Sequence, residues 1–225
     1  LYEMLDMILD IVGNAHLYIH NRRTGKQLHY ARIISNTYRK FAVLLLVSMI
    51  PTALLGYTAR RLVVLAADSV LIPSAGLLVT GIVLLVIDLA RTGGTKAAKD
   101  ANLSDAMWIG LCQGISVFPG LSRSGLTISA GLMSGFSRTF AVKYSYILSI
   151  PAIIGSLIME LGQFGSPAMT VGLGFAYVLG MIVSGVTAFF VIRYCLKLVH
   201  KGRFRVFAIY CFVIGLVTLI INHML

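Results

Sequence analysis

The sequence predicts an all-α, polytopic membrane protein with about six transmembrane helices and one re-entrant helix-loop-helix. Of its 225 residues, 58% are hydrophobic and only 12% are charged, and the mean hydropathy is +0.88. Such a composition is typical of membrane proteins rather than of soluble domains. The apolar residues also occur in runs separated by short polar gaps, most of them near the roughly 20 residues that a helix needs to cross a bilayer. We therefore expect one integral membrane domain over residues 1–225.

The apolar runs define the expected crossings, which are residues 1–20, 41–58, 75–90, 140–161, 169–192 and 206–221. Pro51 is expected to kink the second crossing rather than end it. Polar residues around Pro73 predict a short lead-in before the third crossing, in which Gly76 and Gly81 would allow a neighbouring helix to pack closely. We interpret the whole as the second half of an inverted-repeat fold, an architecture that places binding sites at broken helices.

The segment 107–136 is predicted to be re-entrant. Pro119 lacks a backbone donor, and Gly120 and Gly125 permit unusual dihedral angles, so residues 119–125 cannot continue a helix. The apolar runs on either side are too short to cross a bilayer alone. Irregular backbone at membrane depth is tolerated only where protein buries it or a water-filled cavity reaches it, so the break predicts a cavity.

The break is rich in groups that bind anions. We expect its side chains to project into the cavity, beside free backbone N–H groups where the helix resumes near Gly125, and a phosphate group fits this arrangement best. A guanidinium can hold phosphate oxygens in bidentate fashion, and it is costly inside a membrane unless it serves a partner or substrate. The alternative is that Arg123 pairs with Glu160 or Asp88 and only joins helices. The candidate phosphate-binding residues are Gly120, Ser122, Arg123, Ser124, Gly125 and Thr127, of which Arg123 and Ser122 are the candidate catalytic residues.

The stretch Q-G-I-S-V-F-P-G-L-S-R-S-G-L-T-I-S-A-G-L-M-S-G-F-S-R, which ends at Arg138, follows a tryptophan at position 108. It resembles the second signature of the bacterial undecaprenyl-diphosphate phosphatases, the bacitracin-resistance phosphatases, and the resemblance continues from Lys143 to Pro151. It implies an enzyme of the bacterial plasma membrane that hydrolyses undecaprenyl diphosphate to the monophosphate and phosphate. This activity recycles the lipid carrier for cell-wall peptidoglycan synthesis and confers antibiotic resistance. The resemblance also implies a divalent cation, Mg²⁺ or Ca²⁺.

The first signature of that family, a glutamate-rich segment ending in Ser-Ser-Thr-Gly-His, is not found in the sequence. Because the chain begins at Leu1 rather than at methionine, we expect the natural N-terminal segment to be missing, and we expect hydrolysis only when that segment is restored. Polar residues of 1–20 share one helical face, which is either a metal or acid-base site or a face toward a cavity or partner helix. They are Glu3, Asp6, Asp10 and Asn14, while His16 and His20 lie near the following basic loop. No metal site is visible elsewhere. Two other functions stay open, a polyprenyl-phosphate flippase or transporter and a non-catalytic lipid-phosphate-binding relative.

The net charge of +11 does not predict a nucleic-acid partner, because the basic residues occupy short gaps between apolar runs. If 107–136 is re-entrant, fifteen of the 19 Lys and Arg residues lie in loops on one face, and only Arg60 and Arg61 on the other. The positive-inside rule then makes the basic loops cytoplasmic and the C-terminus extracytoplasmic. The expected partners are the polyprenyl diphosphate and the bilayer, with a homodimer left open. The three cysteines have neither disulfide nor zinc-site spacing.

Overall fold

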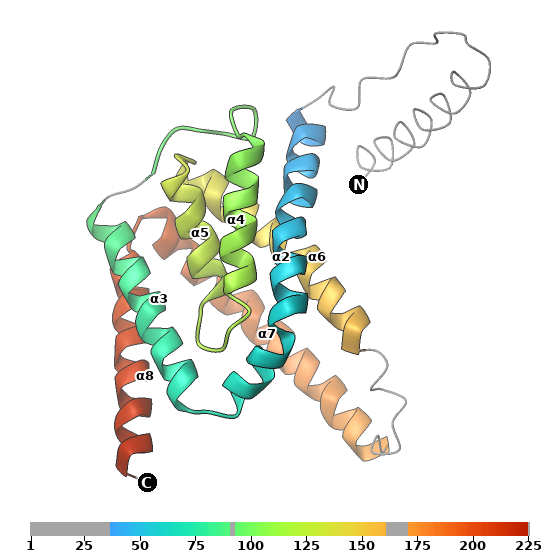
Figure 1. Ribbon diagram of the computed structural model, residues 1–225, viewed down its shortest axis with the longest axis vertical. Coiled ribbons are helices and arrows are strands. Elements are labelled where there is room, and N and C mark those ends of the chain that lie inside the picture. Colours follow the sequence, from blue (N-terminus) through green and yellow to red (C-terminus); the bar gives the residue numbers. More distant parts are fainter. Residues whose placement is uncertain (1–36, 91–92, 161–170, 225) are drawn as a thin grey trace, which may run out of the picture.

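The computed structural model describes residues 37–90, 93–160 and 171–224, and its elements in these ranges are helices (Figure 1). Five of them are long and apolar enough to cross a membrane, so the polytopic fold class is confirmed. The expected crossing at 1–20 and its polar residues lie outside the described residues. The helices are α2 (Thr37–Ala67), α3 (Leu71–Leu89), α4 (Leu103–Ile115), α5 (Arg123–Met133), α6 (Arg138–Glu160), α7 (Val171–His200) and α8 (Phe204–Met224).

Several helix ends differ from the expected ones, and three of them shorten an expected loop or lead-in. Helix α2 continues through Arg60 and Arg61 to Ala67, because arginine is a good helix former that does not end a helix. Helix α3 begins at Leu71 rather than near residue 75, which places Pro73 in its first turn, where the missing N–H would have had no helical partner. Helix α7 continues to His200, so much of the expected loop 193–205 is helical.

The predicted break in 107–136 is confirmed as two short helices joined by residues 116–122. Helices α4 and α5 have 13 and 11 residues. At 1.5 Å per residue, each is no more than about 20 Å long and cannot span a hydrocarbon core of about 30 Å. The helical part starts four residues earlier than expected, because Asn102 and Asp105 form a capping box at the start of α4. The break also ends earlier, at Ser122, so that Gly125 lies inside α5.

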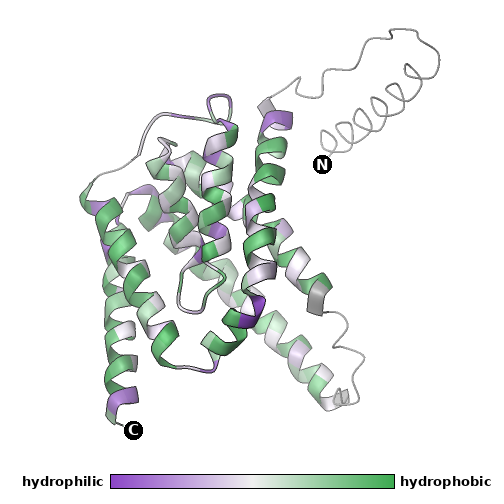
Figure 2. Cartoon of the chain, in the orientation of Figure 1, coloured by the Kyte–Doolittle hydropathy of each residue, from purple (hydrophilic) through white to green (hydrophobic). Residues whose placement is uncertain are grey.

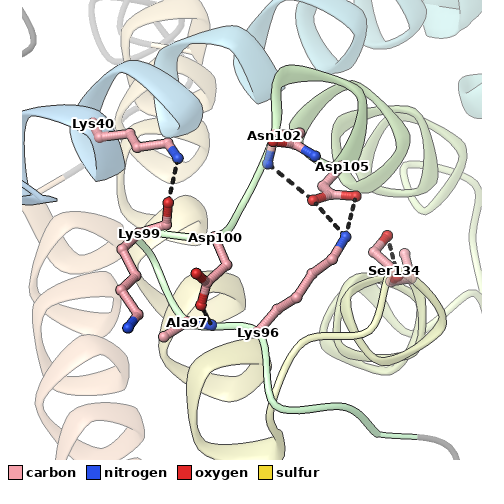
Figure 3. Close-up of polar contacts among 9 residues, drawn as sticks. Lys40, Lys96, Ala97, Lys99, Asp100, Asn102, Asp105 and Ser134 are labelled. Atoms are coloured by element: carbon pink, nitrogen blue, oxygen red, sulfur yellow. Dashed lines mark hydrogen bonds and ion pairs between the residues drawn. The ribbon is translucent and has the colours of Figure 1, made fainter.

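Both ends of this α4–α5 hairpin lie at the same face of the molecule. The segment before α4 pairs with the segment after α5, since Lys96 N donates to Gly135 O at 3.1 Å and Ser137 N donates to Lys96 O at 3.0 Å. The ammonium of Lys96 also pairs with the carboxylate of Asp105 at 3.3 Å (Figure 3). The hairpin therefore enters and leaves at one face, as the distribution of basic residues predicts.

This face, which we call the basic face, also carries the starts of α2, α6 and α8 and the ends of α3 and α7 (Figure 1). Lys40 Nζ donates to the backbone carbonyl of Lys99 there (Figure 3). Asp88 near the end of α3 pairs with Arg205 at the start of α8, with an Nε–Oδ2 distance of 3.3 Å. The end of α8 lies at the opposite end of the molecule (Figure 1).

Small residues and hydroxyls join the helices in the interior. The backbone of Gly110 in α4 lies against Ser48 of α2, and Thr52 Oγ1 donates to Gly110 O at 2.9 Å. The hydroxyl of Tyr144 in α6 lies 2.7 Å from that of Ser48. A Cβ on Gly81 would lie 3.2 Å from the ring of Phe212, which confirms the close packing expected there. Hydrophobic residues follow the long helices and hydrophilic ones gather toward their ends, as a lipid-facing surface requires (Figure 2).

Candidate lipid-phosphate site

The loop 116–122 lies directly on the first turns of α3. A Cβ on Gly76 would come within 2.5 Å of Pro119 O, and a Cβ on Gly120 would overlap Pro73 O. Gly120 also has a φ of 83°, which side chains other than glycine rarely adopt. Glycine at 76 and 120 is therefore what lets the two backbones touch.

Thr80 holds the loop in this position. Its buried hydroxyl accepts a hydrogen bond from Ser122 N at 3.0 Å and lies within donating distance of Gly76 O at 3.0 Å and Gly120 O at 3.3 Å. Thr80 could not be recognised from the sequence as part of the site, because a threonine within an apolar run commonly bonds only its own helix. The available signal was its spacing of four residues from Gly76, which places both on one face of α3.

Ser122 starts α5 and shapes its N-terminus. Its Oγ accepts from Gly125 N at 3.1 Å, and its carbonyl accepts from Leu126 N at 2.9 Å. The backbone N–H groups of Arg123 and Ser124 donate no hydrogen bond to any of the described residues. Two free donors at the positive end of a helix dipole are an arrangement that commonly binds anions, which makes this N-terminus a candidate anion site.

Arg123 is exposed beside these donors, and within the described ranges its guanidinium forms no hydrogen bond or ion pair. The alternative in which Arg123 pairs with Asp88 is wrong, because Asp88 is bound to Arg205. The side chain of Glu160 lies outside the described residues. Arg123 thus lies next to the candidate anion site, and it would not have to break an interaction with any described residue in order to bind an anion.

Thr127 does not project into the cavity, and this part of the expectation is wrong. It lies one helical turn after Arg123, where α5 packs against α6. Its hydroxyl is buried, lies 2.6 Å from the hydroxyl of Ser145 and donates to Arg123 O at 2.8 Å. Thr127 therefore holds the first turn of α5 in place against α6.

The predicted cavity is present beside the loop and has a volume of about 550 Å³. Gly120, Ser122, Ser124 and Gly125 form its polar end. The remainder is largely apolar and comes from α3, α5, α7 and α8, with Leu77, Ile128, Val191 and Phe207 among its residues. Arg123 is not among the residues that line the cavity, so the expectation that its side chain projects into it is wrong, and Arg123 lies beside the polar end instead. A cavity with one polar end and a long apolar remainder suits a ligand with an anionic head and a hydrocarbon tail.

The described residues do not supply a metal site. No group of three or more His, Cys, Asp or Glu side chains comes together within 37–90, 93–160 and 171–224. Glu3, Asp6, Asp10, His16 and His20 lie outside these ranges, so the structure leaves their expected roles untested. The described side chains around the loop therefore do not form a site for the divalent cation that the family resemblance implies.

Comparisons with known proteins agree with this architecture. The profile of the family described as "Bacitracin resistance protein BacA" matches residues 8–217. The undecaprenyl-diphosphatase of Desulforapulum autotrophicum is 40% identical over 185 residues, covering 80% of this chain and 64% of that protein. Those of Alkaliphilus metalliredigens and Korarchaeum cryptofilum are 35% and 37% identical, with 98% and 82% of this chain and 74% and 68% of those proteins covered.

The chain thus spans about two thirds of the length of the curated relatives that it matches, with 64% of the first and 74% of the second covered. The family resemblance carried by the stretch from Trp108 to Arg138 is confirmed over most of the sequence. The chain belongs to the BacA family of bacitracin resistance proteins.

Proposed function

We propose that the protein is an undecaprenyl-diphosphate phosphatase, which hydrolyses the diphosphate of the polyprenyl carrier to the monophosphate and phosphate. The observation that carries the proposal is the cavity, whose polar end is the N-terminus of α5 and whose remainder is apolar. The name undecaprenyl-diphosphatase borne by the relatives supports the same substrate. The activity would recycle the carrier for cell-wall synthesis and account for bacitracin resistance.

In this proposal the diphosphate occupies the polar end of the cavity and the polyprenyl chain its apolar remainder. The N–H groups of Arg123 and Ser124 donate to phosphate oxygens, as helix N-termini commonly do. The hydroxyl of Ser122 accepts from Gly125 N and still has its own hydrogen to donate to the phosphate. Arg123 holds the terminal phosphate with its planar fork.

Phosphoryl transfer depends mainly on positioning and on stabilisation of charge on the equatorial oxygens. Water attacks the terminal phosphorus, the bond from that phosphorus to the bridging oxygen breaks, and the polyprenyl monophosphate leaves. Arg123 and the two N–H donors stabilise the developing charge, and Ser122 orients the phosphate. We assign no step to a divalent cation, because the described residues around the loop do not form a site for one. Dependence on Mg²⁺ or Ca²⁺ stays part of the proposal through the family resemblance alone.

The position of the loop bears on the side from which the substrate enters. The loop lies against Pro73 and Gly76 in the first turns of α3, whereas Asp88 at the other end of α3 belongs to the basic face. We propose that the basic face is cytoplasmic, by the positive-inside rule, in the plasma membrane. The tip of the loop then points toward the extracytoplasmic side, where the C-terminus would also lie. Ser122, which bonds Thr80 in the middle of α3, lies deeper in the membrane.

Phosphate release in detergent tests this function. The protein is purified with the family's first signature segment added ahead of Leu1, the form in which hydrolysis is expected, and it is incubated with undecaprenyl diphosphate in the presence of Mg²⁺, of Ca²⁺ or of a chelator. The same form serves for every turnover measurement below. Phosphate released with a cation and lost with the chelator is the expected result. A flippase or a non-catalytic relative would bind the lipid and release no phosphate, and that result would contradict the proposed activity. A homodimer also stays a prediction, which detergent-corrected light scattering would test.

A further inference from the structure

A second pocket lies at the basic face, where the end of α3 meets the starts of α6 and α8. Its volume is about 380 Å³, smaller than that of the cavity beside the loop. It contains three basic side chains and one acidic side chain. The residues that line it are Asp88, Leu89, Arg138, Lys201, Gly202 and Arg205.

The pocket carries an excess of positive charge that the described residues do not neutralise. Asp88 is committed to Arg205, accepting from its backbone N at 3.3 Å and pairing with its Nε at 3.3 Å. The side chains of Arg138 and Lys201 form no ion pair or hydrogen bond within the described part of the chain. An anion entering the pocket would therefore meet two uncommitted cations and a third held by Asp88.

A close backbone contact and an ion pair position two of the arginines of the pocket. The guanidinium of Arg138 lies against the backbone of Gly202, where a Cβ would overlap its Nη1. Gly202 has a φ of 69° in the turn between α7 and α8, which glycine adopts without strain. On the other wall Arg205 is positioned by Asp88. Arginine groups held in place before binding lose little conformational entropy when they bind a phosphate.

We propose that this pocket binds a phosphate oxyanion and that its occupant is the headgroup of an anionic phospholipid in the leaflet at the basic face. Basic pockets between transmembrane helices bind anionic headgroups, and Arg and Lys clusters recognise their phosphate. Leu89 lies exposed at the edge of the pocket, so acyl chains would continue along an apolar surface. The pocket is distinct from the site at Ser122, whose backbone N bonds Thr80 in the middle of α3, about two helical turns before Asp88. Free inorganic phosphate offers the same oxygens and is the competing source.

Titration of the purified full chain in a non-ionic detergent tests the proposal. The probes are dihexanoyl phosphatidylglycerol, dihexanoyl phosphatidylcholine and inorganic phosphate. The dissociation constant of each probe is measured by calorimetry for the wild type and for three variants, Arg138→Gln, Lys201→Gln and Arg203→Gln. Arg203 is the matched control, because it is exposed in the same turn, carries the same charge and does not line the pocket. If Arg138→Gln fails to fold, the exposed Lys201 variant decides alone.

We expect saturable binding of phosphatidylglycerol that weakens about tenfold in Arg138→Gln and in Lys201→Gln, the loss expected for one charge-assisted contact. We expect the Arg203→Gln constant to change by less than about twofold, and phosphatidylcholine to bind more weakly, since its choline cancels the phosphate charge. If inorganic phosphate binds as tightly as phosphatidylglycerol and the Arg138 and Lys201 variants weaken it equally, the pocket is a phosphate site but a lipid is not its occupant. Equal losses in the Arg203 variant, or no saturable binding, would overturn the pocket itself.

Discussion

The hydroxyl of Thr80 in α3 accepts a hydrogen bond from the backbone N–H of Ser122 at 3.0 Å, across a sequence separation of 42 residues. This bond fixes the residue that caps α5, and so it fixes the direction of the two free N–H groups that follow. Helix α3 thereby positions the proposed anion site from outside the loop. The proposed activity should accordingly depend on residues of α3 that lie outside the phosphate-binding loop.

Thr80→Val should lower turnover more than it lowers stability. The substitution keeps the side-chain shape but leaves the N–H of Ser122 without its acceptor, a loss worth about 1–3 kcal/mol. We expect kcat/KM for undecaprenyl diphosphate to fall by about tenfold and Thr80→Ser to restore it, because serine keeps the hydroxyl. Thr58→Val is the control, since the hydroxyl of Thr58 is exposed and bonds only its own helix. Equal activity of the Thr80→Val and Thr58→Val proteins would contradict the positioning role.

Gly120→Ala should prevent the loop from docking on α3. Its Cβ would overlap the carbonyl of Pro73 at a backbone φ of 83°, so both the contact and the conformation disfavour alanine. Such strain costs about 1–3 kcal/mol before the clash is counted. Gly180→Ala in α7, where a Cβ would meet nothing within 4 Å, is the matched control. Thermal unfolding midpoints in detergent measure the difference, and equal midpoints for both variants would show that the loop is not held against α3 in this way.

Thr127 and Ser145 should behave as a structural pair. Their hydroxyls lie 2.6 Å apart in the interior, so loss of either leaves the other without its partner. We expect Thr127→Val and Ser145→Ala each to lower the free energy of unfolding by about 1–2 kcal/mol, with a smaller combined loss in the double variant than the sum. The KM of the folded Thr127→Val protein should stay near that of the wild type. A large rise in KM without loss of stability would mean that Thr127 contacts the substrate after all.

The two faces of the molecule should be labelled from opposite sides of the membrane. Lys201 lies in the turn between α7 and α8 at the basic face, and Met224 lies at the other end of α8. In a background without native cysteines, Lys201→Cys and Met224→Cys are treated with a membrane-impermeant maleimide in intact cells and after permeabilisation. We expect Met224→Cys to react in intact cells and Lys201→Cys only after permeabilisation. Labelling of both from one side would refute the proposed topology.

Much of the fold and of the site could be predicted from the sequence, because the signals are local. Pro119 and Gly120 disfavour a continuous helix through their own backbone properties, and the short apolar runs around them cannot cross a bilayer. The start of α4 could also have been predicted, since Asn102 and Asp105 have capping-box spacing. The end of α2 could not, because Arg60 and Arg61 are compatible with both a helix and its end.

Other features depend on tertiary packing, which no local pattern reveals. Thr127 is hydroxyl-bearing and lies in the predicted site, but the phase of α5 against α6 turns it toward Ser145 instead of the cavity. The bond from Ser122 to Thr80 joins distant segments, and it exists only because Gly76 and Gly120 allow the loop to approach α3. Hydroxyl groups near a site can thus bind substrate or hold the helix that binds it, and only the packing distinguishes the two.

The turnover of Arg123→Lys tests the central claim, that the loop at the start of α5 holds the diphosphate. Lysine keeps the charge but lacks the planar fork that binds two phosphate oxygens at once. Arg203→Lys is the matched control, since Arg203 is also exposed but lies in the turn between α7 and α8, at the basic face. Phosphate release from undecaprenyl diphosphate is the readout. We expect kcat/KM of Arg123→Lys to fall by at least about tenfold at an unchanged unfolding midpoint, and that of Arg203→Lys to stay within about twofold of the wild type. Wild-type turnover by a well-folded Arg123→Lys protein would contradict the claim.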